Sequence, residues 1–150
     1  MDPGSVLVIC GPTAIGKTAV AMAVQDALGG TERAQLISAD SALIYRGMDI
    51  GTAKPTLHEQ RRYPHALIDI RDPSETYSAA DFVADADAEI ASAIAAKKKP
   101  IVVGGSMMYL KCLLEGIADL PATDIALRQD LEQELAERSA QSLHYELAQQ

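Results

Sequence analysis

The stretch VLVICGPTAIGKT, residues 6–18, decides the fold. Its first five residues are apolar and mostly β-branched, which is typical of a strand buried on both faces of a parallel sheet. The next eight match the pattern GxxxxGK[ST] in full. Residues 18–28 then follow a helical period and stop at Gly29. A strand, a glycine-rich loop and a helix in this order predict a site for a di- or triphosphate, in which backbone amides surround the anion at the helix N-terminus.

Each part of this loop has a chemical reason. The glycines let the chain curl around an anion, the Lys17 ammonium is a mobile charge for the outer phosphate, and the Thr18 hydroxyl is a ligand for Mg²⁺. A chance glycine-rich turn is the alternative, and the flanking strand and helix argue against it. We therefore predict that the whole loop binds the diphosphate or nucleotide, ATP included: Gly11, Pro12, Thr13, Ala14, Ile15, Gly16, Lys17 and Thr18.

Strands and helices alternate along the rest of residues 1–118. Apolar runs predict strands at residues 36–39, 66–70 and 101–103, and helical periods predict helices at 78–96 and 107–114. Ser78 and Asp81 have the spacing of a capping box, Lys97, Lys98 and Lys99 fit the last turn of that helix, and Pro100 ends it. This alternation predicts an α/β fold with a parallel sheet flanked by helices.

The pattern of apolar and polar residues changes after Gly116. Residues 120–124 read as a linker-like turn, and residues 125–150 are polar and helical without a strand. Leu127, Leu131 and Leu135 recur every four residues, as a packing stripe does. We therefore divide the chain into an α/β core, 1–118, and the beginning of a helical segment, 119–150.

Composition excludes several classes of protein. The chain has 150 residues, of which 48% are hydrophobic and 23% are charged, an ordinary globular balance. No apolar run approaches the roughly 20 residues of a membrane span, and the N-terminus lacks the basic region of a signal peptide. Cys10 and Cys112 lie too far apart for a disulfide scaffold or a zinc finger. We expect a cytoplasmic monomer without a membrane partner.

The net charge of −8 argues only weakly against a nucleic-acid partner. Residues 1–75, which carry the motifs, have a net charge of −2, whereas residues 76–150 have −6. An enzyme that binds one RNA at a local site needs a basic surface patch there, but its chain does not need a positive net charge. Basic candidates for phosphate contacts are Arg46, Lys54, Arg61, Arg62 and Arg128, although a solvated surface charge is the simpler interpretation of any one of them.

Three polar segments follow predicted strand ends, at residues 11–18, 40–45 and 104–106. Ligands of parallel sheets bind at the carboxyl ends of the strands, so we expect these segments to meet. An apolar strand that ends in Asp40 also suits a small-molecule kinase, where the carboxylate would hold Mg²⁺. The residues that follow Asp40 favour another function.

The segment SADSALIYRGMDIGTAKP, residues 38–55, resembles the signature of the tRNA dimethylallyltransferases. Further matches follow in the same order: PH at 64–65, LIDI at 67–70, DPS at 72–74, YSAADF at 77–82, and VGGS at 103–106 with Tyr109. The resemblance covers residues 6–128. Ile15, Leu43 and Ser106 depart from the residues common in the family, and family members are longer, so we expect this chain to be an N-terminal part.

The resemblance implies a P-loop NTPase-like sheet with the start of a helical insertion that contacts tRNA. It also implies transfer of a dimethylallyl group from dimethylallyl diphosphate to the exocyclic amine of the adenosine 3′ of the anticodon, with Mg²⁺ as cofactor. The residues expected near the tRNA anticodon loop are Asp40, Ser41, Ala42, Leu43, Ser106 and Arg128.

The chemistry assigns the catalytic candidates. The adenine amine must lose a proton as it attacks, and a carboxylate within reach would accept it, so we predict Asp40 as the base. The Ser106 hydroxyl would donate to the departing pyrophosphate. The structural alternatives are that Asp40 caps a helix or orients Mg²⁺, that Ser106 is a helix N-cap, and that Ser41 is a turn residue.

Other functions remain open at this point. Prenyl transfer to free adenine nucleotides is the nearest alternative, and a small-molecule kinase or a catalytically silent nucleotide-binding module are the others. His58, His65 and His144 lack metal-ligand spacing, which indicates structural or exposed histidines, and Met22, Met107 and Met108 are expected in the core.

Overall fold

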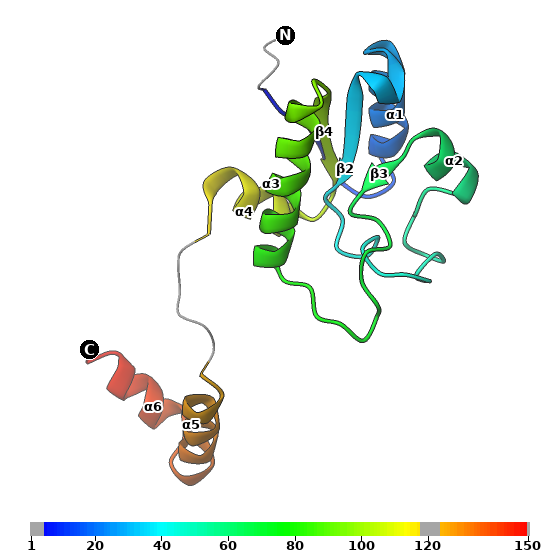
Figure 1. The fold of residues 1–150 in the computed structure, drawn as a ribbon. Helices are drawn as coiled ribbons and strands as arrows, with labels where there is room; N and C mark the ends of the chain where they lie inside the picture. The colour runs from blue at the N-terminus through cyan, green and yellow to red at the C-terminus, as the bar shows by residue number, and fades with distance from the viewer. Residues whose placement is uncertain (1–4, 118–123, 150) are drawn as a thin grey trace. The chain divides into compact units, whose positions relative to one another are not determined.

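The computed structural model describes residues 5–117 and 124–149 (Figure 1). The chain divides into two compact units, Met1–Ile117 and Ala118–Gln150. Among the described residues no helix is long and apolar enough to cross a membrane.

The first unit is built on a parallel four-stranded sheet in the order β1-β4-β2-β3, which confirms the predicted fold class. One core packs between the sheet and α1, around Leu36 and Ile101, and the other packs under α3 and α4, around Phe82 and Val102 (Figure 1). The strands are β1 (Leu7–Cys10), β2 (Ala34–Ser38), β3 (His65–Ala66) and β4 (Lys99–Gly104); the helices are α1 (Lys17–Ala27), α2 (Leu57–Arg62), α3 (Ala79–Ala95) and α4 (Met107–Glu115), with a 3₁₀ turn at Gly30–Glu32.

Two strands differ from the prediction. β1 pairs only with β4 within the described residues, and Leu7, Val8 and Ile9 are half-buried, not buried on both faces. β3 ends after Ala66 because Leu67 and Asp69 have φ angles of 65° and 57°, a left-handed backbone that breaks a strand. The apolar pattern at 66–70 reflects burial of Leu67 in the core and not a longer strand.

The start of α3 follows the prediction. The Ser78 hydroxyl accepts a hydrogen bond from the Asp81 amide at 3.2 Å, and the Asp81 carboxylate accepts one from the Ser78 amide at 2.8 Å. Hydrogen bonds from the Ser78 side chain and backbone hold the pKa of Asp81 below its usual value. The capping box therefore satisfies two donors that α3 would otherwise leave without partners.

We expect Ser78→Ala to lower the free energy of unfolding by about 1 kcal/mol, the usual cost of losing an N-cap side chain. Urea unfolding measures the change, and Ser92→Ala on the exposed side of α3 is the matched control. Because the pKa of Asp81 is depressed in the folded state, this contribution is present at neutral pH and fades as the pH falls through the folded pKa. Equal stability of Ser78→Ala and wild type at neutral pH would contradict the assignment.

Two details near the ends of helices are corrections. α3 ends at Ala95, Lys97 has a φ of 58°, and Lys99 and Pro100 begin β4, so the lysines are not in the helix and Pro100 does not end it. Proline is tolerated at the beginning of a strand. Met22 is buried as expected, but Met107 and Met108 are 61% and 67% exposed on α4 and are not core residues.

The second unit holds two helices, α5 (Ile125–Glu137) and α6 (Ala140–Leu147), and no strand in residues 124–149, as predicted. The Asp124 carboxylate caps α5 by accepting from the amides of Ala126 and Leu127 at 2.9 and 3.1 Å. The leucines of the predicted packing stripe, 127, 131 and 135, are 47–56% exposed. The predicted turn at 120–124 lies outside the described residues except for Asp124.

Candidate active site

The phosphate loop, residues 11–18, joins β1 to α1. Ala14 and Gly16 have φ angles of 65° and 93°, and Gly16 is the N-cap residue of α1. No side chain caps α1, so the amides of its first turn remain available to an anion. The Lys17 ammonium donates to the Pro12 carbonyl at 2.7 Å and so lies over the loop.

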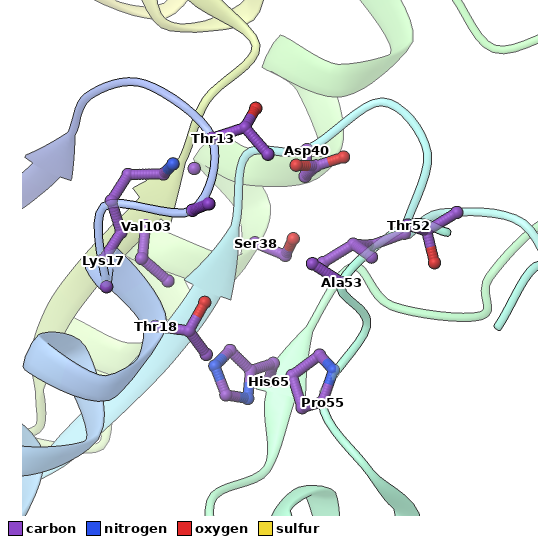
Figure 2. A pocket seen from close by; sticks show the side chains of 14 residues that line it. Thr13, Lys17, Thr18, Ser38, Asp40, Thr52, Ala53, Pro55, His65 and Val103 are labelled. Atoms are coloured by element: carbon purple, nitrogen blue, oxygen red, sulfur yellow. The ribbon is translucent and has the colours of Figure 1, made fainter. Parts of the chain in front are cut away.

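A pocket of about 300 Å³ opens beside this loop (Figure 2). Ser38, Asp40, Val103 and Gly104 contribute to it from the ends of β2 and β4. Across the pocket from the loop lie Thr52, Ala53 and Pro55, with the His65 ring between Pro55 and Thr18 (Figure 2). Five of the eight predicted loop residues line the pocket, namely Thr13, Ala14, Gly16, Lys17 and Thr18, whereas Gly11, Pro12 and Ile15 do not.

The ends of β2 and β4 meet at a backbone contact that only glycine permits. The Ala39 amide donates to the Val103 carbonyl at 2.8 Å, and the Ser106 amide donates to the Ala39 carbonyl at 3.2 Å. A Cβ atom on Gly104 would lie 2.0 Å from the same Ala39 carbonyl oxygen. These contacts bring Asp40 and Ser106 to the same edge of the sheet, as the positions of both residues at strand ends predicted.

Asp40 is half-buried and faces the pocket that Lys17 and Thr18 also line (Figure 2). One of its carboxylate oxygens accepts from the Ala42 amide at 2.9 Å, which fixes the turn that follows β2. No helix begins between Asp40 and Thr56, so the alternative that Asp40 is a helix cap is wrong. Its other carboxylate oxygen accepts no hydrogen bond from the described residues.

Ser106 precedes α4, but its hydroxyl makes no capping hydrogen bond, so the N-cap alternative is wrong for the side chain. The hydroxyl instead accepts from the Ser41 amide at 2.8 Å and donates to the Ser41 hydroxyl at 3.2 Å. Ser41 is therefore more than a turn residue, because it joins the segment after β2 to the segment after β4. Ser41, Ala42 and Ser106 lie outside the lining of the pocket, whereas Leu43 belongs to it.

The basic candidates have different environments. Lys54 is buried in ion pairs with Asp49 and Asp69, so it is not a surface charge. Arg46 donates to the Ile70 carbonyl at 3.2 Å. Arg62 pairs with Asp26 at 3.7 Å, and Arg61 is exposed on α2. Arg128 is exposed on α5 in the second unit, where it pairs with Glu132 at 3.1 Å.

Sequence reasoning missed three polar residues of the pocket, Ser38, Thr52 and His65. Ser38 is 2% exposed, and its hydroxyl points into the pocket without a hydrogen-bond partner among the described residues (Figure 2). Its position two residues before Asp40 is the signal, because Ser38 ends β2 and side chains two positions apart along extended backbone share a face. The Nδ1 atom of His65 lies 2.7 Å from the Tyr63 carbonyl oxygen and donates to it, because a carbonyl can only accept. Its Nε2 has no partner in the described part of the chain, and burial lowers the pKa of the ring.

Oxygen ligands for Mg²⁺ are available in the pocket. The Thr18 hydroxyl and the Asp40 carboxylate both line it, and such groups suit Mg²⁺. Residues 5–117 and 124–149 contain no cluster of three or more His, Cys, Asp or Glu that would form an all-protein metal site. This donor set fits an ion held by one or two side chains together with phosphate oxygens and waters.

The parallel sheet and the glycine-rich loop at the N-terminus of α1 define a P-loop NTPase-like α/β protein. Within that class, the model of the IPP transferase family matches residues 43–150, so the chain belongs to the IPP transferase family.

The similar proteins agree with this assignment. The chain is 54% identical over 142 residues to a tRNA dimethylallyltransferase of Chromohalobacter salexigens, covering 95% of this chain and 44% of that protein. It resembles the crystal structure of a full-length tRNA isopentenylpyrophosphate transferase from Bacillus halodurans, with a TM-score of 0.72, 37% identity, and coverage of 97% of this chain and 47% of the other. A eukaryotic dimethylallyltransferase acting on tRNA matches with a TM-score of 0.70 and 28% identity over 81% of this chain and 30% of its own. The chain thus spans less than half the length of these relatives.

Proposed function

We propose that the protein is a tRNA-modifying prenyltransferase, which transfers a dimethylallyl group from dimethylallyl diphosphate to the exocyclic amine of the adenosine 3′ of the anticodon. The observation that carries this proposal is one pocket in which a phosphate loop and the Asp40 carboxylate face the same space. The names of the relatives from Chromohalobacter salexigens and of the eukaryotic structure support the tRNA acceptor.

The pocket offers separate surfaces for the two ends of the donor. The loop amides, Lys17 and Thr18 suit the diphosphate, whereas Leu43, Ala53 and Val103 are apolar and suit a five-carbon chain. In this proposal the loop holds the leaving group of the reaction and not a nucleotide that is hydrolysed. Thr18 would hold Mg²⁺, which when bound supplies charge stabilisation to the diphosphate.

The proposed reaction breaks the bond between the prenyl carbon and the diphosphate oxygen and forms a bond from that carbon to the adenine nitrogen. The electron pair of the broken bond leaves with pyrophosphate, whose negative charge Lys17 and the loop amides stabilise. The proton of the amine passes to Asp40, whose free carboxylate oxygen is open to the pocket. The Ser106 hydroxyl is proposed to donate to the departing pyrophosphate, for which it would have to exchange its present partner, Ser41.

The acceptor base must leave the stack of the anticodon loop, at a cost of a few kcal/mol. Arg128 remains a proposed tRNA contact. We propose that the protein is a monomer and acts in the cytoplasm.

Transfer to a free adenine nucleotide is the second candidate function, because the pocket alone does not require a polymeric acceptor. Phosphoryl transfer is disfavoured because the family match covers residues 43–150.

Calorimetry with Mg²⁺ and dimethylallyl diphosphate tests the donor site. We expect Lys17→Ala to weaken binding by about 10- to 150-fold, since a hydrogen bond to a charged group contributes about 1.5–3 kcal/mol. Lys111→Ala is the matched control, because Lys111 is an exposed lysine on α4. Unchanged affinity in Lys17→Ala would contradict the assignment of the loop.

The acceptor is tested separately. The intact protein is incubated with the donor and either an anticodon stem-loop or free AMP, and prenylated adenosine is detected by mass spectrometry. Product on the stem-loop supports the proposal, product on AMP alone supports the second candidate, and turnover of ATP without prenyl transfer would overturn both.

A further inference from the structure

The segment 45–55 has no regular secondary structure, yet it forms one wall of the pocket. Gly47 and Gly51 have φ angles of 74° and 78°, and Ala53, which is not glycine, has a φ of 56°. A left-handed backbone at alanine is unfavourable and persists only where surrounding contacts impose it. Something other than local preference must therefore hold this wall in place.

Lys54 makes the contacts that can do so. Its ammonium donates to the Asp49 carboxylate at 2.8 Å, to the Asp69 carboxylate at 2.6 Å and to the Tyr45 carbonyl at 2.9 Å. These three acceptors use all three donors of an ammonium group. Two of them lie within the segment, and Asp69 lies beyond β3, where its amide donates to the Leu43 carbonyl at 3.0 Å. The lysine thus ties the segment to the chain that leaves the sheet.

The side chain of Lys54 is 2% exposed and does not line the donor pocket, whereas both of its neighbours, Ala53 and Pro55, do. Figure 2 shows those two residues on the side of the pocket that faces the phosphate loop. Burial alone would lower the pKa of Lys54, but its hydrogen bonds to Asp49 and Asp69 outweigh burial and raise the pKa. The Lys54 ammonium is therefore charged at neutral pH, and it stabilises the wall without itself lining the pocket.

We propose that Lys54 is a positioning residue for the prenyl donor: its buried ammonium fixes the segment 45–55, so that Ala53 and Pro55 form the apolar wall against which the dimethylallyl chain packs. This inference rests on the proposed function, because it assigns the wall to the prenyl part of the donor. It differs from a direct role in phosphate or RNA binding, for which the buried lysine has no donor left.

The proposal separates the two parts of the donor. The diphosphate is held by the loop at residues 11–18, which stands on β1 and α1 and makes no hydrogen bond to Lys54. Loosening the wall should weaken binding of dimethylallyl diphosphate and leave binding of inorganic pyrophosphate unchanged. A general loss of stability would weaken both ligands together.

The test compares Lys54→Met, which keeps the length of the side chain and removes the charge, with Lys111→Met as the control on an exposed lysine. The dissociation constants of dimethylallyl diphosphate and of pyrophosphate are measured with Mg²⁺, and hydrogen exchange follows the amides of residues 47–53. We expect Lys54→Met to weaken the prenyl diphosphate about tenfold and pyrophosphate less than about twofold, because the wall must then be ordered by the ligand. Exchange should accelerate at 47–53 and not in α1.

A second variant keeps the test valid if Lys54→Met fails to fold. Asp49 is 66% exposed at its side chain, so Asp49→Ala removes one partner of Lys54 at little cost in burial and should give the same selective loss in weaker form. Lys54→Arg should restore part of the selectivity, because guanidinium can bind both carboxylates.

Faster exchange at 47–53 with an unchanged ratio of the two dissociation constants would overturn the proposal, as would equal weakening of both ligands. A wild-type protein that binds pyrophosphate but gains nothing from the prenyl group would instead refute the donor part of the proposed function.

Discussion

Replacing Asp40 by Asn is expected to lower the rate of prenyl transfer by about 10²–10⁴-fold, the range typical of a lost general base. The amide has nearly the size of the carboxylate, and its oxygen can still accept from the Ala42 amide, which lies 2.9 Å from Asp40. The turn after β2 should therefore keep its shape while the basic group is lost. Single-turnover transfer to an anticodon stem-loop measures the rate, and calorimetry measures binding of the donor.

The control for Asp40→Asn is Asp87→Asn, which removes an exposed carboxylate from α3 at the same change of charge. We expect the control to transfer at the wild-type rate. If Asp40→Asn also abolishes binding of the diphosphate with Mg²⁺, Asp40 is a metal ligand and not the base. If it transfers at the wild-type rate, neither role is correct.

The sequence was sufficient to predict the parts of the fold whose signals are local. The phosphate loop is specified by glycines and a lysine at fixed spacing, and the capping box at Ser78 by two polar residues three positions apart. The convergence of Asp40 and Ser106 was also predictable, since both follow strands of one parallel sheet. In each of these cases the contacts that matter connect neighbours in the chain or follow from the sheet alone.

The remaining features depend on contacts between distant segments. Lys54 has the sequence context of a surface charge, and only the position of Asp69 after β3 makes it a buried ion pair. The apolar run at 66–70 predicts a strand, but the left-handed backbone at Leu67 and Asp69 ends β3 after two residues. His65 became a pocket residue because β3 lies beside β2. The order of residue types along the chain does not reveal which distant segments lie next to each other in the fold.

Replacing Gly104 by Ala is expected to destabilise the first unit by about 3 kcal/mol or more, and to lower the melting temperature by about 10 °C. The added Cβ would lie 2.0 Å from the Ala39 carbonyl oxygen and 2.4 Å from its carbon. Both are backbone atoms, so no rotation of a side chain can relieve the overlap. The hydrogen bonds on either side of Gly104, Ala39 to Val103 and Ser106 to Ala39, would have to lengthen.

Gly105→Ala is the matched control for Gly104→Ala, because Gly105 is the next residue along the chain, directly after the end of β4. There the nearest atom to the new Cβ is the Lys17 ammonium at 3.4 Å, the end of a flexible side chain, so we expect little change in melting temperature. Thermal unfolding of both variants gives the comparison. Equal melting temperatures for Gly104→Ala and wild type would mean that the ends of β2 and β4 are not in contact.

The same substitution also separates the two halves of the proposed site. The phosphate loop follows Cys10, which pairs with Gly104 across β1 and β4, and continues into α1, whereas Asp40 and Ser106 follow the two strand ends that meet at Gly104 itself. At a temperature where Gly104→Ala remains folded, we expect prenyl transfer to fall by a larger factor than the affinity for pyrophosphate. Equal losses would mean that the loop also depends on this contact, so that the strand ends and the loop behave as one structural unit.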